Sequence, residues 1–167
     1  ALAPDYPDRR RSGMGRRETY DDEFRPRAAA LGVEDRVVPT GWLGPEELRL
    51  AYAATDVFVT PSLCFDTFGI VNLEAMERAK PVVATTFGGS REVIEEGATG
   101  FIENPFDVEA YAARSGELLR DEDLRVRMGR AGRRRLLERC SMGRLADDFE
   151  GIYREATELG RASWRGR

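Results

Sequence analysis

The chain has 167 residues, a length that suits one domain, and its net charge of −4 argues against a protein that binds the phosphate backbone of nucleic acid. It contains no histidine, which excludes His-based catalytic triads, histidine metal sites and imidazole acid–base chemistry. Hydrophobic residues make up 41% of the chain, as in globular proteins, yet no apolar run approaches the roughly 18 residues that a membrane span needs.

The cysteines and the first residues of the chain indicate the cellular compartment in which the protein works. Cys64 and Cys140 lie far apart in the sequence and show no spacing typical of a metal site. We interpret both as free thiols of a reducing compartment. Residues 1–12 are polar and Arg-rich, so they do not form a secretory signal pattern. These features predict a cytoplasmic protein, with no metal ion and no cofactor expected.

The first elements become recognisable after residue 30. Residues 1–30 are poor in aliphatic side chains and predict an irregular segment. A short strand is expected over residues 36–39, and a helix with an apolar face begins at Pro45. Residues 56–60 are apolar and β-branched, which is typical of a buried strand, and Pro61 ends it.

Helices and strands alternate along the rest of the chain. A helix over 70–79 follows a loop, and Ser90 and Asp107 are expected to be the N-caps of two later helices. The remaining elements are predicted in the order strand 81–85, helix 91–96, strand 101–103, helix 108–119 and two Arg-rich helices over 121–139 and 142–160. This alternation predicts an α/β fold with a Rossmann-like, doubly wound parallel sheet. With four strands instead of five or six, the sheet is expected to be incomplete at its N-terminal end.

In an open parallel sheet, ligands bind at the carboxyl ends of the strands. Three predicted loops leave such ends, over residues 41–44, 62–69 and 86–90, and all three carry glycine or small polar residues. The middle loop leads straight into a helix, whose unsatisfied N–H groups and dipole favour a phosphate. Gly69 allows the ligand to approach the backbone closely.

Two carboxylates flank this expected phosphate site. Asp66 lies in the loop and Glu74 lies one helical turn after Gly69. A carboxylate repels phosphate but accepts two hydrogen bonds well, which suits the vicinal diol of a ribose or a sugar. The pattern therefore favours a nucleotide diphosphate that carries a sugar. The purely structural alternative stays open, in which Glu74 only complements the helix dipole and the glycines only make turns.

The residues around this loop resemble the family 4 glycosyltransferases. The hallmark of that family is two glutamates separated by seven residues, with Phe-Gly between them. Here the pair is Asp66 and Glu74, within TPSLCFDTFGIVNLEAM over residues 60–76. The later motifs keep the order and spacing of the family, and they read KPVVAT over 80–85, Gly88–Gly89, and GATGF over 97–101. The resemblance covers about residues 30–155.

This resemblance implies half of an enzyme of the GT-B architecture, in which two Rossmann-like domains face each other. The first binds the acceptor, and the second, which this chain resembles, binds the nucleotide-sugar donor. Transfer retains the anomeric configuration and needs no metal, since helix dipoles and basic residues stabilise the leaving diphosphate. The implied partners are therefore a nucleotide-sugar and an acceptor-binding domain that is missing or lies on another chain.

The resemblance also assigns roles to single residues. It implies that Glu74 holds the ribose hydroxyls and that Asp66 contacts the transferred sugar as the catalytic residue. The sugar and the diphosphate are expected to meet the backbone of Phe68, Gly69, Ile70 and Val71. The base is expected to lie beside the 41–44 loop, with Gly41. From its position after the first expected strand, Trp42 is interpreted either as a ring that stacks on the base or as an aromatic residue packed near the sheet edge. Gly88 and Gly89 complete the implied donor site.

Three departures from the family pattern are visible. Asp66 replaces the usual glutamate and is one methylene shorter. Ala79 stands where the family often has a glycine that ends the helix in a left-handed conformation, so we expect a slightly strained turn. The first strand of the domain and the Arg–Lys pair that grips the diphosphate are not visible. Arg16 and Arg17 are instead interpreted as a solvated face.

We therefore divide the chain into a remnant of the domain start over residues 1–30, a donor-binding domain over 31–160 and a tail over 161–167. The chain alone is expected to be inactive. The alternatives are a non-catalytic nucleotide-binding module, a decayed remnant of such an enzyme and, more distantly, a sugar-nucleotide epimerase of the same architecture. Arg133, Arg134 and Arg135 are interpreted as a solvated face, with no nucleic acid as a partner. The sequence leaves open whether a membrane surface is a partner.

Overall fold

The computed structural model describes residues 24–65 and 67–164, which divide into two compact units with a boundary after Leu50. The first unit contains helix α2 (Arg25–Ala30), the 3₁₀ helix η2 (Glu34–Arg36) and the beginning of α3 (Pro45–Ala54). All other helices and strands of the described residues belong to the second unit.

The strand expected over residues 36–39 was wrong. Arg36 ends η2, and residues 37–40 have no regular secondary structure. Glu34 and Asp35 occupy the first turn of η2, where carboxylates complement the helix dipole. Val38 is 79% exposed, so the apolar pattern of this segment does not reflect burial in a sheet.

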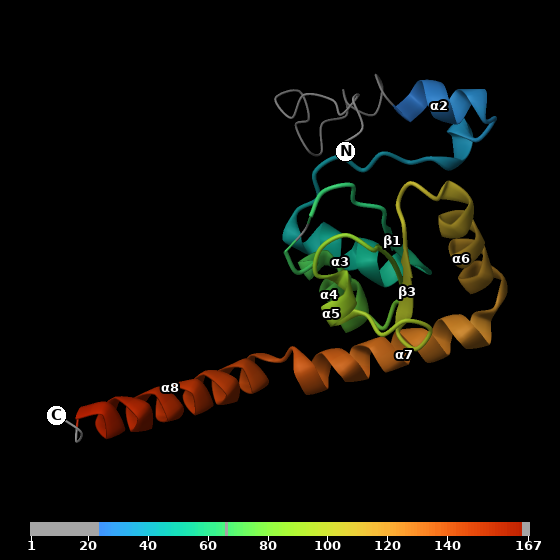
Figure 1. Ribbon diagram of the computed structural model, residues 1–167. Helices are drawn as coiled ribbons and strands as arrows, with labels where there is room; N and C mark the ends of the chain where they lie inside the picture. The colour runs from blue at the N-terminus through green and yellow to red at the C-terminus, as the bar shows by residue number, and fades with distance from the viewer. Residues whose placement is uncertain (1–23, 66, 165–167) are drawn as a thin grey trace. The chain divides into compact units, whose positions relative to one another are not determined.

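The second unit is built on a parallel sheet, as the sequence predicts (Figure 1). Its three strands are β1 (Phe58–Thr60), β2 (Val82–Thr85) and β3 (Gly100–Glu103), in the order β1-β2-β3. Phe58 lies opposite Val82, which in turn lies opposite Gly100. Because the strands are parallel and adjacent in sequence order, the loops that follow them emerge at the same edge of the sheet.

The helices of the second unit follow the predicted order. They are α4 (Ile70–Glu77), α5 (Ser90–Val93), α6 (Val108–Arg120), α7 (Glu122–Arg139) and α8 (Met142–Trp164). The prediction for Asp107 is confirmed, since its side chain accepts a hydrogen bond of 2.9 Å from the N–H of Ala110. The prediction for Ser90 was wrong: Gly89 is the N-cap, and Ser90 is a buried first residue. The helix also ends early, because Ile94 is already extended.

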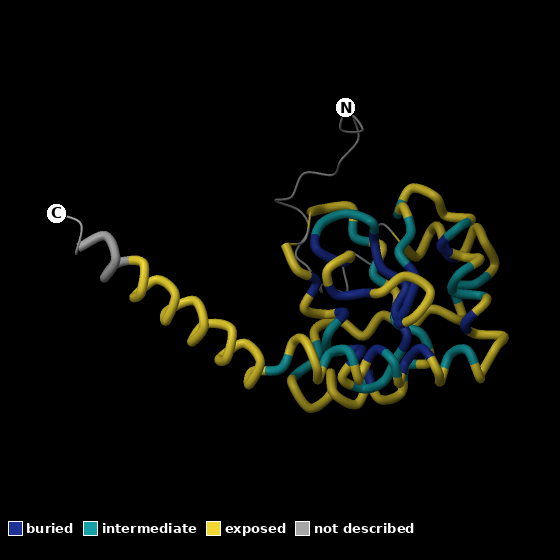
Figure 2. Tube along the Cα trace, turned by 60° about the horizontal axis from the view of Figure 1, so that its bottom comes forward, coloured by how far each residue is buried: buried dark blue, intermediate teal, exposed yellow. Residues whose placement is uncertain are grey.

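The hydrophobic core lies on both faces of β2, whose four residues are all buried (Figure 2). Val82 and Ala84 pack in a cluster with Met76 of α4 and with Val93 of α5. The intervening Val83 packs in a second cluster, made with Phe101, Tyr111, Leu118 and Met128. The alternation of side chains along a strand thus divides the core into two layers.

Helix α7 packs closely against the amino ends of β2 and β3. A Cβ atom at Gly129 would overlap the carbonyl of Ala79, which precedes β2, and one at Gly132 would lie 3.7 Å from the carbonyl oxygen of Thr99, which precedes β3. The two glycines are spaced on one side of α7 and are both buried. They allow α7 to approach the turn at the end of α4.

Ala79 has a left-handed backbone with φ = 54°, and it is the one described non-glycine residue with a positive φ. The N–H of Ala79 bonds to the carbonyl of Met76 at 2.9 Å, and the N–H of Lys80 bonds to the carbonyl of Ala75 at 3.0 Å. This pair of bonds is the Schellman motif that normally ends on glycine. The strain expected at Ala79 therefore has a structural basis.

We predict that Ala79→Gly stabilises the fold by about 0.5–1 kcal/mol, because it removes the left-handed strain of a Cβ atom at a small cost in chain entropy. Urea denaturation of both proteins measures this difference. The matched control is Gly97→Ala, where φ is +75° and a Cβ atom would meet nothing within 4 Å. It introduces the same strain, so it should destabilise by a similar amount. Equal stability of Ala79→Gly and the parent chain would contradict the assignment of strain.

Candidate functional site

Two of the predicted ligand loops come together at the carboxyl edge of the sheet. One follows β1 and leads into α4, and the other follows β2. A Cβ atom at Gly89 would overlap the carbonyl oxygen of Thr67 and lie 2.9 Å from the Cα atom of Phe68. Glycine at position 89 is thus what allows the two backbones to touch. The neighbouring Gly88 has φ = 73°, a value that side chains disfavour.

Gly69 makes the turn from the first loop into α4. Its φ is 79°, and a Cβ atom there would lie 2.7 Å from the amide nitrogen of Asn72. Asn72 is buried, and its side-chain oxygen accepts a hydrogen bond of 2.9 Å from the hydroxyl of Thr60 at the end of β1. The carbonyl of Thr60 accepts a bond of 3.2 Å from Tyr111 of α6. These bonds fix the start of α4 to the carboxyl end of β1.

The start of α4 is suited to an anion. Gly69 is its N-cap residue and provides no side-chain cap, and no acidic residue lies in the first turn. The N–H groups of Ile70 and Val71 have no acceptor inside the helix, while that of Asn72 bonds to the carbonyl of Gly69 at 2.9 Å. The dipole of the helix adds a partial positive charge at the same place.

Glu74 is held in place by a tyrosine that our interpretation of the sequence missed. The hydroxyl of Tyr52, on α3, donates a hydrogen bond of 2.8 Å to Oε2 of Glu74 and lies 3.5 Å from the carbonyl oxygen of Val71. Burial raises the pKa of Tyr52 well above its ordinary value, and the hydrogen bond and the charge of Glu74 raise it further. The tyrosine therefore stays a donor at neutral pH. Its position on the apolar side of α3 gave no signal of this role.

Only some of the other predicted site residues lie in the part of the second unit that the structure describes. Asp66 lies outside the described residues, as do Arg16 and Arg17. Gly41, with φ = 65°, and Trp42, which is 85% exposed, belong to the first unit, so their part in a donor site stays a prediction. Gly88, Gly89, Phe68, Gly69, Ile70 and Val71 all belong to the two loops and the helix start that meet in the second unit.

Two basic residues of the second unit, Lys80 and Arg135, make contacts away from these loops. Lys80 donates a hydrogen bond of 2.8 Å to the carbonyl of Ala53 near the end of α3. Arg135 was expected to be part of a solvated face, but its guanidinium bonds to the carbonyls of Val93 and Glu92 and to the carboxylate of Glu95. It therefore joins α7 to the end of α5. The expectation for Arg135 was wrong because an arginine can reach the unsatisfied carbonyls of a short helix.

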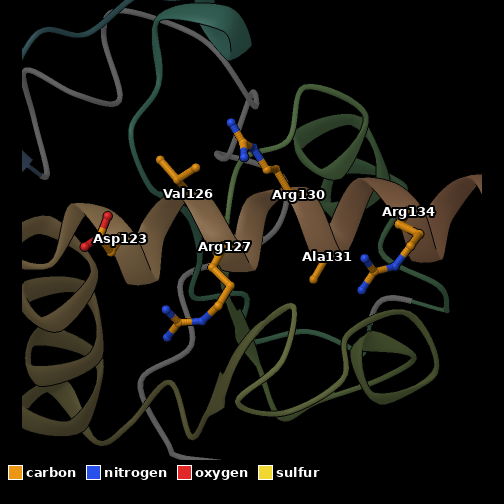
Figure 3. Close-up of a pocket in the computed structure, with 6 residues that line it drawn as sticks. All are labelled: Asp123, Val126, Arg127, Arg130, Ala131 and Arg134. Atoms are coloured by element: carbon orange, nitrogen blue, oxygen red, sulfur yellow. The ribbon is translucent and has the colours of Figure 1, made fainter.

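A hollow of about 560 Å³ lies along α7 and is lined by Asp123, Val126, Arg127, Arg130, Ala131 and Arg134 (Figure 3). All of these residues come from one helix, and α7 packs at the amino ends of the strands. The hollow is therefore separate from the loops at the carboxyl edge, where the predicted site residues of the second unit gather.

Within the described part of the chain, no group of three or more Cys, Asp or Glu side chains is placed so that it could hold a metal ion. The described helices include none with the length and apolar character of a membrane span.

Comparisons with known proteins show the family and the fold of the chain. The model of the family described as "Glycosyl transferases group 1" matches residues 13–135. Alpha-maltose-1-phosphate synthase of Mycolicibacterium smegmatis is 40% identical over 121 residues, which cover 69% of this chain and 31% of that enzyme.

Solved structures of related proteins have the same fold as this chain. The HepE protein of Anabaena, crystallised with UDP, aligns with a TM-score of 0.75 and 25% identity over 83% of this chain and 37% of its own. The C-terminal domain of LpcC, a glycosyl transferase group 1 family protein of Francisella tularensis, aligns with a TM-score of 0.68 and 23% identity, over 74% and 63% of the two chains. The chain thus spans about a third of the synthase and of HepE, and its fold is that of the C-terminal, Rossmann-like half.

We predict that Tyr52→Phe lowers the free energy of unfolding by about 1–2 kcal/mol, because it removes a hydrogen bond to a carboxylate. It should also change the pH dependence. With its pKa raised, Tyr52 contributes its full stability below the unfolded value of about 10 and loses it as the pH rises further. The stability of the parent chain should therefore fall more steeply than that of the variant above about pH 10.

Urea denaturation between neutral pH and pH 11 measures both effects. Tyr153→Phe is the matched control, since Tyr153 is exposed on α8. If the two variants show the same stability and the same pH profile, the Tyr52–Glu74 contact has no energetic role.

Proposed function

The chain belongs to the glycosyl transferases group 1, and from this membership we propose that it binds the nucleotide-sugar donor of a retaining sugar transfer. The observation that carries the proposal is the junction of two glycine-lined loops at the start of α4, with Glu74 one turn further along the helix. This junction offers N–H groups to a diphosphate and a carboxylate to hydroxyls.

The diphosphate is proposed to lie at the start of α4. The N–H groups of Ile70 and Val71 would bond to its oxygens, and Gly69 and the backbone of Phe68 would let it approach closely. Gly88 and Gly89 bring the second loop beside the same point, where a side chain would exclude either the ligand or the first loop. The charge that develops on the leaving diphosphate would be stabilised by these N–H groups and by the helix dipole, with no metal required.

Glu74 is proposed to accept hydrogen bonds from the ribose hydroxyls. Tyr52 donates to one carboxylate oxygen, which leaves the other oxygen for the ligand. A fixed carboxylate loses little rotational freedom when the ribose binds, so the tyrosine would favour binding. Gly41 and Trp42 are proposed to border the base.

Asp66 is proposed to contact the transferred sugar next to the reacting carbon. In the transfer, the bond between the anomeric carbon and the diphosphate oxygen breaks, and the diphosphate leaves with the electron pair. A new bond forms from the acceptor oxygen to the same face of that carbon, and the proton of the acceptor hydroxyl passes to the leaving diphosphate. The acceptor and the groups that bind it are proposed to lie on a second domain.

Helix α8 supports the proposal of a second domain. Its apolar residues Met142, Leu145, Phe149 and Ile152 recur at intervals of three and four, and Leu159 continues the same stripe seven residues later. Each is between 47% and 78% exposed, and residues 142–159 of the helix are drawn in the colour of exposed residues in Figure 2. An apolar stripe of this kind is normally covered by a neighbouring element.

We predict that Glu74→Ala weakens the binding of both UDP and UDP-glucose about tenfold or more, because the ribose is present in both and a bond to a carboxylate is lost. Asp66→Ala should weaken only UDP-glucose, since its partner is the sugar. Calorimetric titration of each variant with both ligands measures these affinities. Glu77→Ala, which removes an exposed carboxylate from the same helix, is the matched control and should bind as the parent does. Equal weakening of both ligands by both variants would contradict the division of roles.

We further predict that the 167 residues alone do not transfer sugar, because they span about a third of the relatives and carry an uncovered stripe on α8. The measurement is the release of nucleoside diphosphate from its sugar conjugate in the presence of an acceptor. Sustained, acceptor-dependent turnover by the purified chain would refute this. Binding of nucleotide without turnover, even after an acceptor domain is supplied, would favour the alternative of a non-catalytic module.

A further inference from the structure

Three phenylalanine rings lie in a row across the carboxyl edge of the sheet. Phe65 follows β1, Phe87 follows β2 and Phe106 follows β3, so the order of the rings is the order of the strands. The ring centroids of Phe65 and Phe87 are 5.7 Å apart, and those of Phe87 and Phe106 are 6.0 Å apart. The three rings thus form a continuous aromatic surface contributed by three different loops.

The two outer rings are turned to solvent. Phe65 is 83% exposed and Phe106 is 62% exposed, while Phe87 between them is half-buried. The contacts with Phe87 hold the outer rings in place without covering them. Two exposed rings contribute little to the core, and clustered exposed apolar side chains mark binding surfaces.

The row is continuous with the loops of the candidate donor site. Phe87 directly precedes Gly88 and Gly89, and Gly89 packs on Thr67, two residues after Phe65. A molecule lying on the rings would therefore lie beside any ligand held at the start of α4. In a transfer reaction, the position beside the donor is the position of the acceptor.

The rings themselves restrict the chemistry of the ligand. A phenylalanine ring carries no charge and no hydrogen-bond donor, so it offers no favourable contact to a phosphate or an anionic lipid headgroup. The nearby charges are mixed: the loops over residues 61–69, 86–89 and 104–107 contain two aspartates, and the guanidinium of Arg91 lies 3.2 Å from the hydroxyl oxygen of Thr86, beside Phe87. Aromatic rings in turn attract the apolar face of a sugar ring or an attached apolar group.

We propose that Phe65, Phe87 and Phe106 form an acceptor subsite, which takes a neutral acceptor through the apolar face of its sugar ring or of the group attached to it. The assignment as an acceptor subsite rests on the proposed transferase function. The binding surface itself rests on the rings alone, so the two can be tested separately.

The test uses the full chain with two neutral probes, phenyl β-D-glucopyranoside and methyl β-D-glucopyranoside, and measures binding by ligand-observed NMR titration. The phenyl glucoside should bind more tightly than the methyl glucoside. Phe65→Ala and Phe106→Ala should each weaken it about three- to tenfold, since each removes one aromatic contact. Phe106→Tyr should restore the affinity, because it keeps the ring. Thermal melts confirm that the exposed positions tolerate the changes.

The matched control is Phe149→Ala, which removes a 48% exposed ring from α8 and should leave the affinity unchanged. Absence of phenyl glucoside binding to the parent chain, or equal affinity in Phe65→Ala, Phe106→Ala and the control, would overturn the proposal. Ring-dependent sedimentation with phosphatidylcholine vesicles, without glucoside binding, would overturn it in favour of a lipid surface.

UDP titrations of the same samples test the proposed donor site separately from the proposed aromatic subsite. The Phe65 and Phe106 variants should bind UDP as the parent does, because the nucleotide is proposed to lie at the start of α4. If UDP does not bind at all while glucoside binding depends on the rings, the donor function fails and the aromatic site stands. If UDP binds and the rings have no effect on the glucoside, the aromatic subsite fails alone.

Discussion

The burial of β2 on both faces is the constraint on which the rest of the second unit depends. A strand of four buried residues exposes no polar side chain to solvent, so helices must cover both of its faces. Val82 and Ala84 pack against α4 and α5, and Val83 packs against α6 and α7. Because a parallel neighbour can be reached only by a crossover, α4 also returns the chain from β1 to the start of β2, and α5 returns it from β2 to the start of β3. The layered arrangement and the common direction of the strands follow from this one strand.

The common direction of the strands also brings the candidate site together. Loops separated by about twenty residues in the sequence emerge at one edge, where Gly89 packs on Thr67 and the rings of Phe65, Phe87 and Phe106 meet. At the opposite edge, Gly129 and Gly132 let α7 approach the turns before β2 and β3. The fold thus separates a closely packed edge from an edge with glycine, aromatic residues and a helix start. Only the second has the groups that we propose to bind a nucleotide and a sugar.

Two features of the second unit, its small sheet and the exposed apolar stripe of α8, are typical of a domain that packs against another element. The described sheet has three strands where a doubly wound domain usually has more, and the apolar stripe of α8 is exposed. The chain spans about a third of the full-length relatives to which it was compared. These observations support the proposal of a half-enzyme, in which donor groups are proposed to lie on this unit and acceptor groups partly on the aromatic row and partly on a second domain.

The sequence by itself determined the parallel α/β fold, most helix bounds, the cap at Asp107 and the left-handed end of α4 at Ala79. All of these depend on local patterns or on motifs of fixed spacing. It did not determine that Tyr52 holds Glu74, that Arg135 reaches the end of α5, or that three phenylalanines form one surface. It also assigned a strand to residues 36–39 from two valines alone. Each of these depends on which distant residues become neighbours, and that is decided only when the strands pair and both faces of β2 are covered.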